Sequence, residues 1–105
     1  MAVLGPWRAS GQSTMVPGRA MHNPGDLALY YYDGCPYCER VRRALRDLEV
    51  EVEMRNVLHD KQHLADLVAA RGRRTVPVLR IRKEGGDEWM PESRDIVRYL
   101  NERFG

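Results

Sequence analysis

A pair of cysteines separated by two residues constrains this 105-residue chain more than any other feature. Cys35 and Cys38 are its only cysteines. They follow a short apolar and aromatic run, residues 27–32, which predicts a buried strand that leads into a turn. A small secreted domain normally spreads more cysteines along the chain, because cross-linked loops compensate for a thin core. A disulfide between Cys35 and Cys38 would close a very small ring and would constrain the unfolded chain very little. The pair therefore indicates a thiol that takes part in chemistry, placed between a strand and a helix.

The segment after the first cysteine predicts a helix and then a half-exposed strand. Pro36 suits the first turn of a helix, because the N–H that proline lacks would be unpaired there. Apolar residues recur at helical spacing and form one core-facing stripe: Val41, Ala44, Leu45 and Leu48. Apolar and polar residues then alternate, which predicts a strand with one side inside and one side in water. The inner side is Val50, Val52 and Met54, and the outer side is Glu51, Glu53 and Arg55.

The second half of the chain predicts a helix, a hairpin and a final helix. The second helix is expected over about residues 59–71 and ends at Gly72. A strand over residues 76–81, a turn over 83–87 and a returning strand over 88–90 follow. The inner face of the second helix is expected to be Leu64, Leu67 and Val68. A final helix begins near Ser93, and its inner face is expected to be Ile96, Val97, Leu100 and Phe104. The order βαβαββα predicts an α/β layer sandwich with a central mixed sheet.

Composition limits the partners of the chain. Hydrophobic residues make up 43% of the chain and charged residues 30%, which is ordinary for a soluble domain and too polar for a membrane span of about 20 apolar residues. The net charge of +2 comes from Arg8 and Arg19, since residues 1–25 contain no acidic residue. The remainder is balanced, so we expect neither a nucleic acid nor a membrane as partner.

Residues 1–25 are expected to form a flexible extension ahead of a domain at residues 26–105. They are rich in glycine and proline and show no apolar periodicity. The apolar run Val3-Leu4 is too short for a secretory signal, which favours a cytoplasmic protein. Arginine and serine without acidic residues are also typical of an organellar transit peptide, and translation from Met15 or Met21 is a simpler account of the segment.

The two cysteines are expected to have different roles. If Pro36 is the first helical residue, Cys35 is the N-cap, and its sulfur faces unpaired backbone N–H groups at the positive end of the helix dipole. This environment favours the thiolate, which is the nucleophile in disulfide exchange. Cys38 lies almost one turn later, where it can attack the Cys35 sulfur, and it should be the more buried and less acidic thiol. Helix geometry decides which nearby arginine adds to the positive field: Arg40, Arg42 or Arg43.

Two structural interpretations compete with this chemistry. The cysteines could form a disulfide without catalysis, although so small a ring stabilises little. They could also bind zinc together with His59 and His63, which lie four residues apart on an expected helix. The gap between Cys38 and His59 exceeds the usual finger spacing and contains a whole strand, so exposed helix histidines are the better interpretation.

Two further segments matter in combination with the cysteines. Proline at the start of a strand-like run, as in Thr75-Val76-Pro77, belongs at a strand entry, a turn or a cis bond, because it cannot donate a ladder hydrogen bond. Glu92-Ser93 opens the final helix, where Ser93 could simply be the N-cap. With Cys35-Pro36-Tyr37-Cys38, these segments resemble the glutaredoxin family and the related N-terminal domain of glutathione transferases, over about residues 26–105.

The resemblance implies a thioredoxin-like fold with a central mixed four-stranded sheet and a cis peptide before Pro77. That peptide would bring the Val76 backbone beside the active sulfur, so that glutathione pairs with it like an added strand. One glutathione carboxylate would bind beside Ser93 at the N-terminus of the final helix, and Glu92 could take the ligand's ammonium group. The resemblance further implies Tyr37 beside the sulfur, Thr75 next to Val76, and Arg73 or Arg74 at the other carboxylate. Plain surface exposure is the ordinary alternative for Tyr37 and the two arginines.

The implied activity is glutathione-dependent reduction of protein disulfides or glutathione mixed disulfides, with Cys35 attacking and Cys38 resolving. Glutathione is then a co-substrate, no cofactor is bound permanently, the partners are disulfide-containing or glutathionylated proteins, and we expect a monomer. Residues 89–95 depart from many glutaredoxins toward the transferase-type domain, so a single-domain transferase-like protein is one alternative. Delivery of an iron–sulfur cluster across a dimer is another, which Pro36 disfavours, and a non-enzymatic interaction module is a third.

Overall fold

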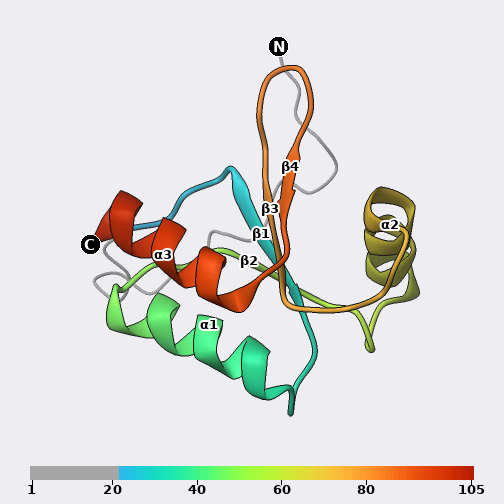
Figure 1. Cartoon of the computed structure of the whole chain (residues 1–105), viewed down its shortest axis with the longest axis horizontal. Helices are drawn as coiled ribbons and strands as arrows, with labels where there is room; N and C mark the ends of the chain where they lie inside the picture. The colour runs from blue at the N-terminus through green and yellow to red at the C-terminus, as the bar shows by residue number, and fades with distance from the viewer. Residues whose placement is uncertain (1–21) are drawn as a thin grey trace.

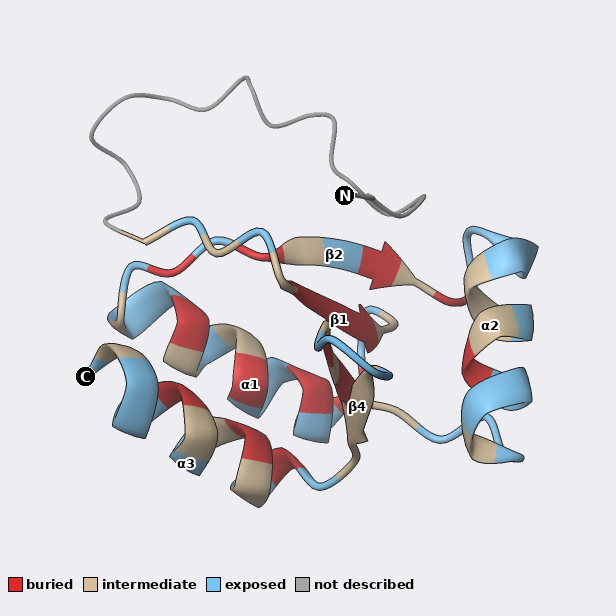
Figure 2. Ribbon diagram, turned by 90° about the horizontal axis from the view of Figure 1, so that it is seen from above, coloured by how far each residue is buried: buried red, intermediate tan, exposed pale blue. Residues whose placement is uncertain are grey.

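The computed structural model describes residues 22–105, which contain seven regular elements. In chain order these are β1 (Leu27–Tyr31), α1 (Pro36–Asp47), β2 (Glu53–Asn56), α2 (Lys61–Arg71), β3 (Val78–Ile81), β4 (Glu88–Met90) and α3 (Ser93–Phe104). The strands form one sheet in the order β2-β1-β3-β4, with β1 parallel to β2 and the other pairs antiparallel. Helices α1 and α3 lie on one face and α2 lies on the other (Figures 1 and 2). The predicted order and the mixed four-stranded sheet are confirmed.

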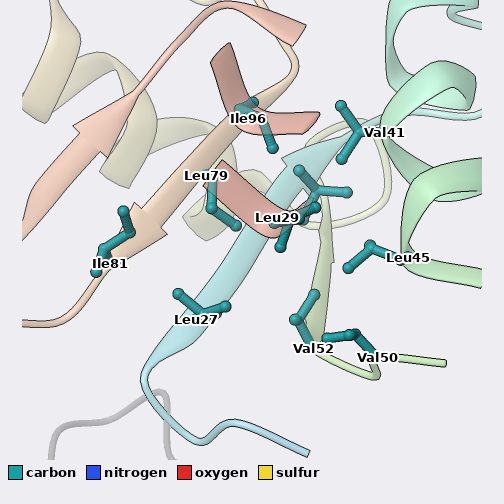
Figure 3. Packing of buried hydrophobic residues seen from close by; sticks show 10 residues of the cluster. Leu27, Leu29, Val41, Leu45, Val50, Val52, Leu79, Ile81 and Ile96 are labelled. Carbon is teal, nitrogen blue, oxygen red and sulfur yellow. The ribbon is translucent and has the colours of Figure 1, made fainter. Parts of the chain in front are cut away.

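The larger part of the core lies between the sheet and the α1–α3 layer. Alternate residues of β1 and β3 point to this side, because successive side chains of a strand face opposite ways. Figure 3 shows these side chains meeting those of α1, α3 and the segment before β2. The buried residues of this cluster are Leu27, Leu29, Val41, Leu45, Val50, Val52, Leu79, Ile81, Ile96 and Leu100. The apolar stripes predicted for α1 and α3 supply the helical members.

The opposite face of the sheet buries a tyrosine and an arginine beneath α2. Tyr30 is fully buried, and its hydroxyl oxygen accepts hydrogen bonds from Arg55 at 2.7 Å and from Arg80 at 3.0 Å. Arg55 is only 5% exposed and also donates to Glu53 at 2.9 Å. The prediction that Arg55 lies on a solvated side was wrong, because α2 covers the face that alternation alone assigned to water. Met54, predicted inside, is 38% exposed on the edge strand β2.

Helix α2 begins later than predicted and is attached by few side chains. Its N-cap is Asp60, whose carboxylate accepts the Gln62 N–H at 2.8 Å. Before it, the Asn56 side chain accepts backbone N–H groups of the turn. The helix ends as predicted at Gly72, whose φ of 74° is left-handed. Leu67 is its buried residue, whereas Val68, predicted inside, is 40% exposed.

The ends of the described chain bear on the predicted domain boundary. Residues 1–21 of the predicted extension lie outside the described residues, so the extension stays a prediction there. His22 exchanges two backbone hydrogen bonds with Glu49 and Glu51, both at 3.0 Å, and its ring lies 5.0 Å from that of Phe104.

In the part of the chain described, no helix is long and apolar enough to cross a membrane.

The buried hydroxyl of Tyr30 generates a stability prediction. Tyr30→Phe removes an acceptor that serves two guanidinium groups while keeping the ring, so we expect the free energy of unfolding to fall by about 1–3 kcal/mol. Urea denaturation followed by circular dichroism measures the change. Tyr99→Phe is the matched control, because its hydroxyl accepts from Arg103 at an exposed site, and its effect should stay within about 0.5 kcal/mol. Equal effects of the two changes would contradict the prediction.

Candidate active site

Cys35 caps the N-terminus of α1, as predicted. Its backbone is extended, with φ −86° and ψ 118°, and Pro36 is the first helical residue. The backbone N–H of Cys38 donates to the Cys35 sulfur at 3.4 Å. The preceding Gly34 has a φ of 92°, so the chain turns sharply from β1 into the helix. The sulfur therefore lies against helix N–H groups, where a negative charge is stabilised.

Cys38 lies inside the first turn of α1 and differs from Cys35 in burial. Both thiols are free, but Cys38 is fully buried and Cys35 retains 5% exposure. Burial, helped by the hydrogen bond with Cys35, raises the pKa of the Cys38 thiol from 9.0 to about 12. Cys38 consequently keeps its proton at neutral pH, and it is the more buried of the two thiols, as predicted.

Two arginines near the start of α1 have different neighbours. Arg42 donates to Asp33 at 2.9 Å and to Glu39 at 3.1 Å, so its charge is balanced by carboxylates. The Arg40 guanidinium lies 5.8 Å from the centre of the Tyr37 ring. Tyr37 is 59% exposed and is thus available to a ligand. Arg40 is the member of the predicted trio that packs beside the Cys-x-x-Cys segment.

Strand pairing brings the second predicted segment to the same edge of the sheet. Tyr30 pairs with Val78 in antiparallel register, so the residues that follow β1 lie beside those that precede β3. The Val76–Pro77 peptide is cis, as the resemblance implied. Strand β3 begins at Val78 rather than at residue 76, and Pro77 is buried whereas Thr75 is exposed. Cys35 and the residues before β3 therefore lie at one edge of the sheet.

The N-terminus of α3 reaches this edge through β4. Leu79 pairs with Met90, so the chain after Met90 runs toward the start of β3. Glu92 is the N-cap of α3 but its side chain makes no capping hydrogen bond, and Ser93 is the first helical residue, 8% exposed. The alternative that Ser93 is merely the N-cap was wrong. The N–H groups of the first turn, unpaired within a helix, can receive an anion.

Arg73 and Arg74 are exposed in the connection between α2 and β3. With Thr75 they line a groove of about 850 Å³ that extends along α2. Sequence reasoning missed this groove, because it placed Val68 in the core. Within residues 22–105, no three or more His, Cys, Asp or Glu side chains form a group able to hold a metal ion. The structure thus does not gather His59 and His63 with the cysteines into a zinc site.

Known proteins share this arrangement over much of the chain. The family described as glutathione S-transferase, N-terminal domain, matches residues 29–105. Glutaredoxin 2 of Escherichia coli strain K12 is 33% identical over 79 residues, which cover 75% of this chain and 34% of that protein. The chain therefore spans about a third of the length of this curated relative.

Solved structures of glutathione enzymes are similar in fold. A trimeric glutathione transferase of Leishmania has a TM-score of 0.62 and 28% identity, covering 75% of this chain and 18% of its own. A maleylacetoacetate isomerase from Anaeromyxobacter dehalogenans 2CP-1, with dicarboxyethyl glutathione and citrate bound in its active site, has a TM-score of 0.57 and 30% identity. That match covers 75% of this chain and 37% of the isomerase. The predicted thioredoxin-like fold is confirmed by these neighbours.

The difference between the two thiols can be measured by alkylation. Between pH 7 and 9, about the range in which an ordinary thiol begins to ionise, iodoacetamide should label Cys35 and leave Cys38 unlabelled, because Cys38 is buried and its pKa is raised to about 12. Peptide mass spectrometry of the native protein checks this, and labelling in urea is the control that should modify both residues. Comparable labelling of Cys38 in the native protein would contradict the asymmetry.

Proposed function

Because this chain belongs to the family of glutathione S-transferase N-terminal domains, we propose that it is a glutathione-dependent thiol–disulfide oxidoreductase of the glutaredoxin type. The observation that carries the proposal is the pair of free thiols in the first turn of α1, one at the helix cap and one fully buried. A dithiol reductase needs one thiolate that attacks the substrate disulfide and a second thiol that resolves the mixed disulfide. The relative named Glutaredoxin 2 supports this choice within the family.

The chemistry follows from the positions of the two sulfurs. The Cys35 thiolate attacks the glutathione sulfur of a glutathionylated protein, the S–S bond breaks, and the protein thiolate leaves and takes up a proton from water. Cys35 then carries glutathione as a mixed disulfide. A second glutathione thiolate attacks that glutathione sulfur, which forms glutathione disulfide and returns Cys35 to its thiolate.

Protein disulfides require the second thiol. After Cys35 has formed a mixed disulfide with the substrate, Cys38 loses its proton to solvent and attacks the Cys35 sulfur. The substrate thiolate is released and Cys35 and Cys38 become a disulfide, which two glutathione molecules reduce. Burial holds the pKa of Cys38 above its ordinary value, so loss of its proton is a required part of this step.

We assign the glutathione site to the edge of the sheet at which the predicted segments meet. The Val76 backbone offers strand-like pairing to the cysteine of glutathione. One carboxylate of glutathione binds the free N–H groups beside Ser93, with Glu92 at its ammonium group. Arg73 or Arg74 binds the other carboxylate, Thr75 lies next to it, and Tyr37 flanks the sulfur.

A transferase-like reaction is the second candidate, favoured by the family match and by the solved transferases. In that case Cys35 or a neighbouring group would activate glutathione itself for attack on an electrophile. A resolving thiol in the position of Cys38 has no task in such a reaction. Conjugation of glutathione to chlorodinitrobenzene, measured beside disulfide reduction, separates the two activities.

Exposure to glutathione disulfide tests the proposal directly. We expect a glutathione adduct on Cys35, seen by mass spectrometry of the Cys38→Ser variant, in which the adduct cannot be resolved. Cys35→Ser should abolish turnover, whereas Cys38→Ser should retain reduction of glutathione mixed disulfides, because that route needs one thiol. The reverse pattern of the two variants, or an adduct on neither cysteine, would sink the proposal.

The uncapped start of α3 provides a separate test of the glutathione site. In the proposed site the Ser93 hydroxyl donates to the same carboxylate as the N–H groups, so Ser93→Ala removes one donor, and a charge-assisted hydrogen bond of this kind corresponds to about a tenfold rise in the KM for glutathione. Steady-state kinetics at varied glutathione should show this rise, with an unchanged thermal midpoint as evidence of folding. A KM equal to that of the parent chain would remove Ser93 from the site.

A further inference from the structure

One side of α2 borders the groove of about 850 Å³ and is not covered by the rest of the described chain. Leu64, Ala65 and Val68 supply apolar lining, and Val68 is 40% exposed. These residues recur at spacings of three and four, so they form one stripe along the helix. A groove with exposed apolar residues on a small domain is a place where another molecule can bind.

Three basic residues border the same apolar groove. Lys61, Arg73 and Arg74 line it, and no acidic residue does. All three are exposed, and among residues 22–105 none of them forms an ion pair. The acidic residues nearest in sequence, Asp60 and Asp66, are outside the lining and accept hydrogen bonds from Gln62, and Asp60 also lies 3.5 Å from His63. The groove therefore favours an occupant that is both apolar and acidic.

Glutathione is too short to fill this groove. Helix α2 runs from Lys61 to Arg71, which corresponds to about 16 Å. A tripeptide extends over about 10 Å, and in the site assigned above it reaches from Ser93 to the Arg73–Arg74 end. The lining toward Lys61 lies beyond the reach of glutathione, so it is open to a neighbouring segment of the protein that carries the mixed disulfide.

Charge decides among the possible occupants. The N-terminal segment, residues 1–25, carries two arginines and no acidic residue, so its charge has the same sign as the groove. A second copy meeting the groove across a two-fold axis would bring Lys61, Arg73 and Arg74 toward their own symmetry mates. An acidic segment of a protein substrate has neither conflict.

We infer that this groove docks an acidic, apolar segment of the protein substrate next to its glutathionylated cysteine, an inference that rests on the proposed reductase function. The apolar side chains of that segment cover Ala65 and Val68, and its carboxylates face Lys61 and the arginine that glutathione leaves free. Proteins with acidic surroundings at the modified cysteine are thus the preferred substrate class.

Two synthetic glutathionylated peptides test the preference, one with glutamate and leucine flanking the cysteine and one with lysine and leucine. At low ionic strength, kcat/KM for the acidic peptide should exceed that for the basic peptide by about tenfold, and salt should reduce the ratio. Lys61→Glu and Val68→Glu should remove most of the preference, while turnover of bis(2-hydroxyethyl) disulfide, too small to reach the groove, stays unchanged. Arg43→Glu and Ala69→Glu are matched controls on exposed helix positions outside the groove lining, and they should keep the preference.

Binding separates this inference from the proposed function. A fluorescent, cysteine-free acidic peptide should bind the whole protein, and Val68→Glu should weaken that binding severalfold, whether or not the protein is a reductase. Absence of any disulfide turnover would defeat the proposed function and leave this measurement intact. Equal kcat/KM for the two peptides, or a Val68-dependent dimer that occupies the groove in ultracentrifugation, would overturn the inference.

Discussion

The antiparallel pairing of β1 with β3 is the constraint on which the site depends. It sets the end of β1, where the chain turns into Cys35, beside the cis Val76–Pro77 peptide that leads into β3. Because β4 pairs with β3 in turn, the start of α3 arrives at the same edge. Three segments far apart in sequence are therefore brought together by backbone ladders alone, which leaves their side chains free for chemistry. A shift of one residue in this register would turn Leu29 and Leu79 out of the core, so core and site hold each other in place.

The two faces of the sheet are built on different principles. The α1–α3 face is closed by the larger apolar cluster, whereas the α2 face combines a smaller apolar cluster around Leu67 with Tyr30, Arg55 and Arg80, which are joined through one hydroxyl. The buried Arg55 guanidinium would cost free energy without its hydrogen bonds, so Tyr30 and Glu53 are needed on this face. Helix α2 contributes one buried residue, Leu67, and keeps Val68 in solvent. Because Leu67 is the buried residue of α2, Val68 remains exposed and lines the groove.

Local sequence signals predicted most of the fold, and the errors share a cause. Pro36, Gly72 and the periodic stripes of α1 and α3 act within a few residues, so their consequences were visible in the sequence. Arg55, Met54 and Val68 were misplaced because alternation and helical spacing reveal that a side is apolar or polar, not which neighbour covers it. Arg55 tolerates burial because it donates both to Glu53 nearby and to Tyr30, 25 positions away in sequence. The groove was invisible for the same reason, since it exists only where α2 stands against the returning chain.

The proposed roles of the two thiols follow from where α1 begins. Their environments differ because a helix begins between them. Cys35 lies before the first turn, among N–H groups that have no intrahelical partner, and Cys38 lies inside that turn against the core. In the proposed reaction, the helix start that stabilises charge on one sulfur also buries the other, so Cys35 attacks and Cys38 resolves. This proposed order follows from where α1 begins in the backbone.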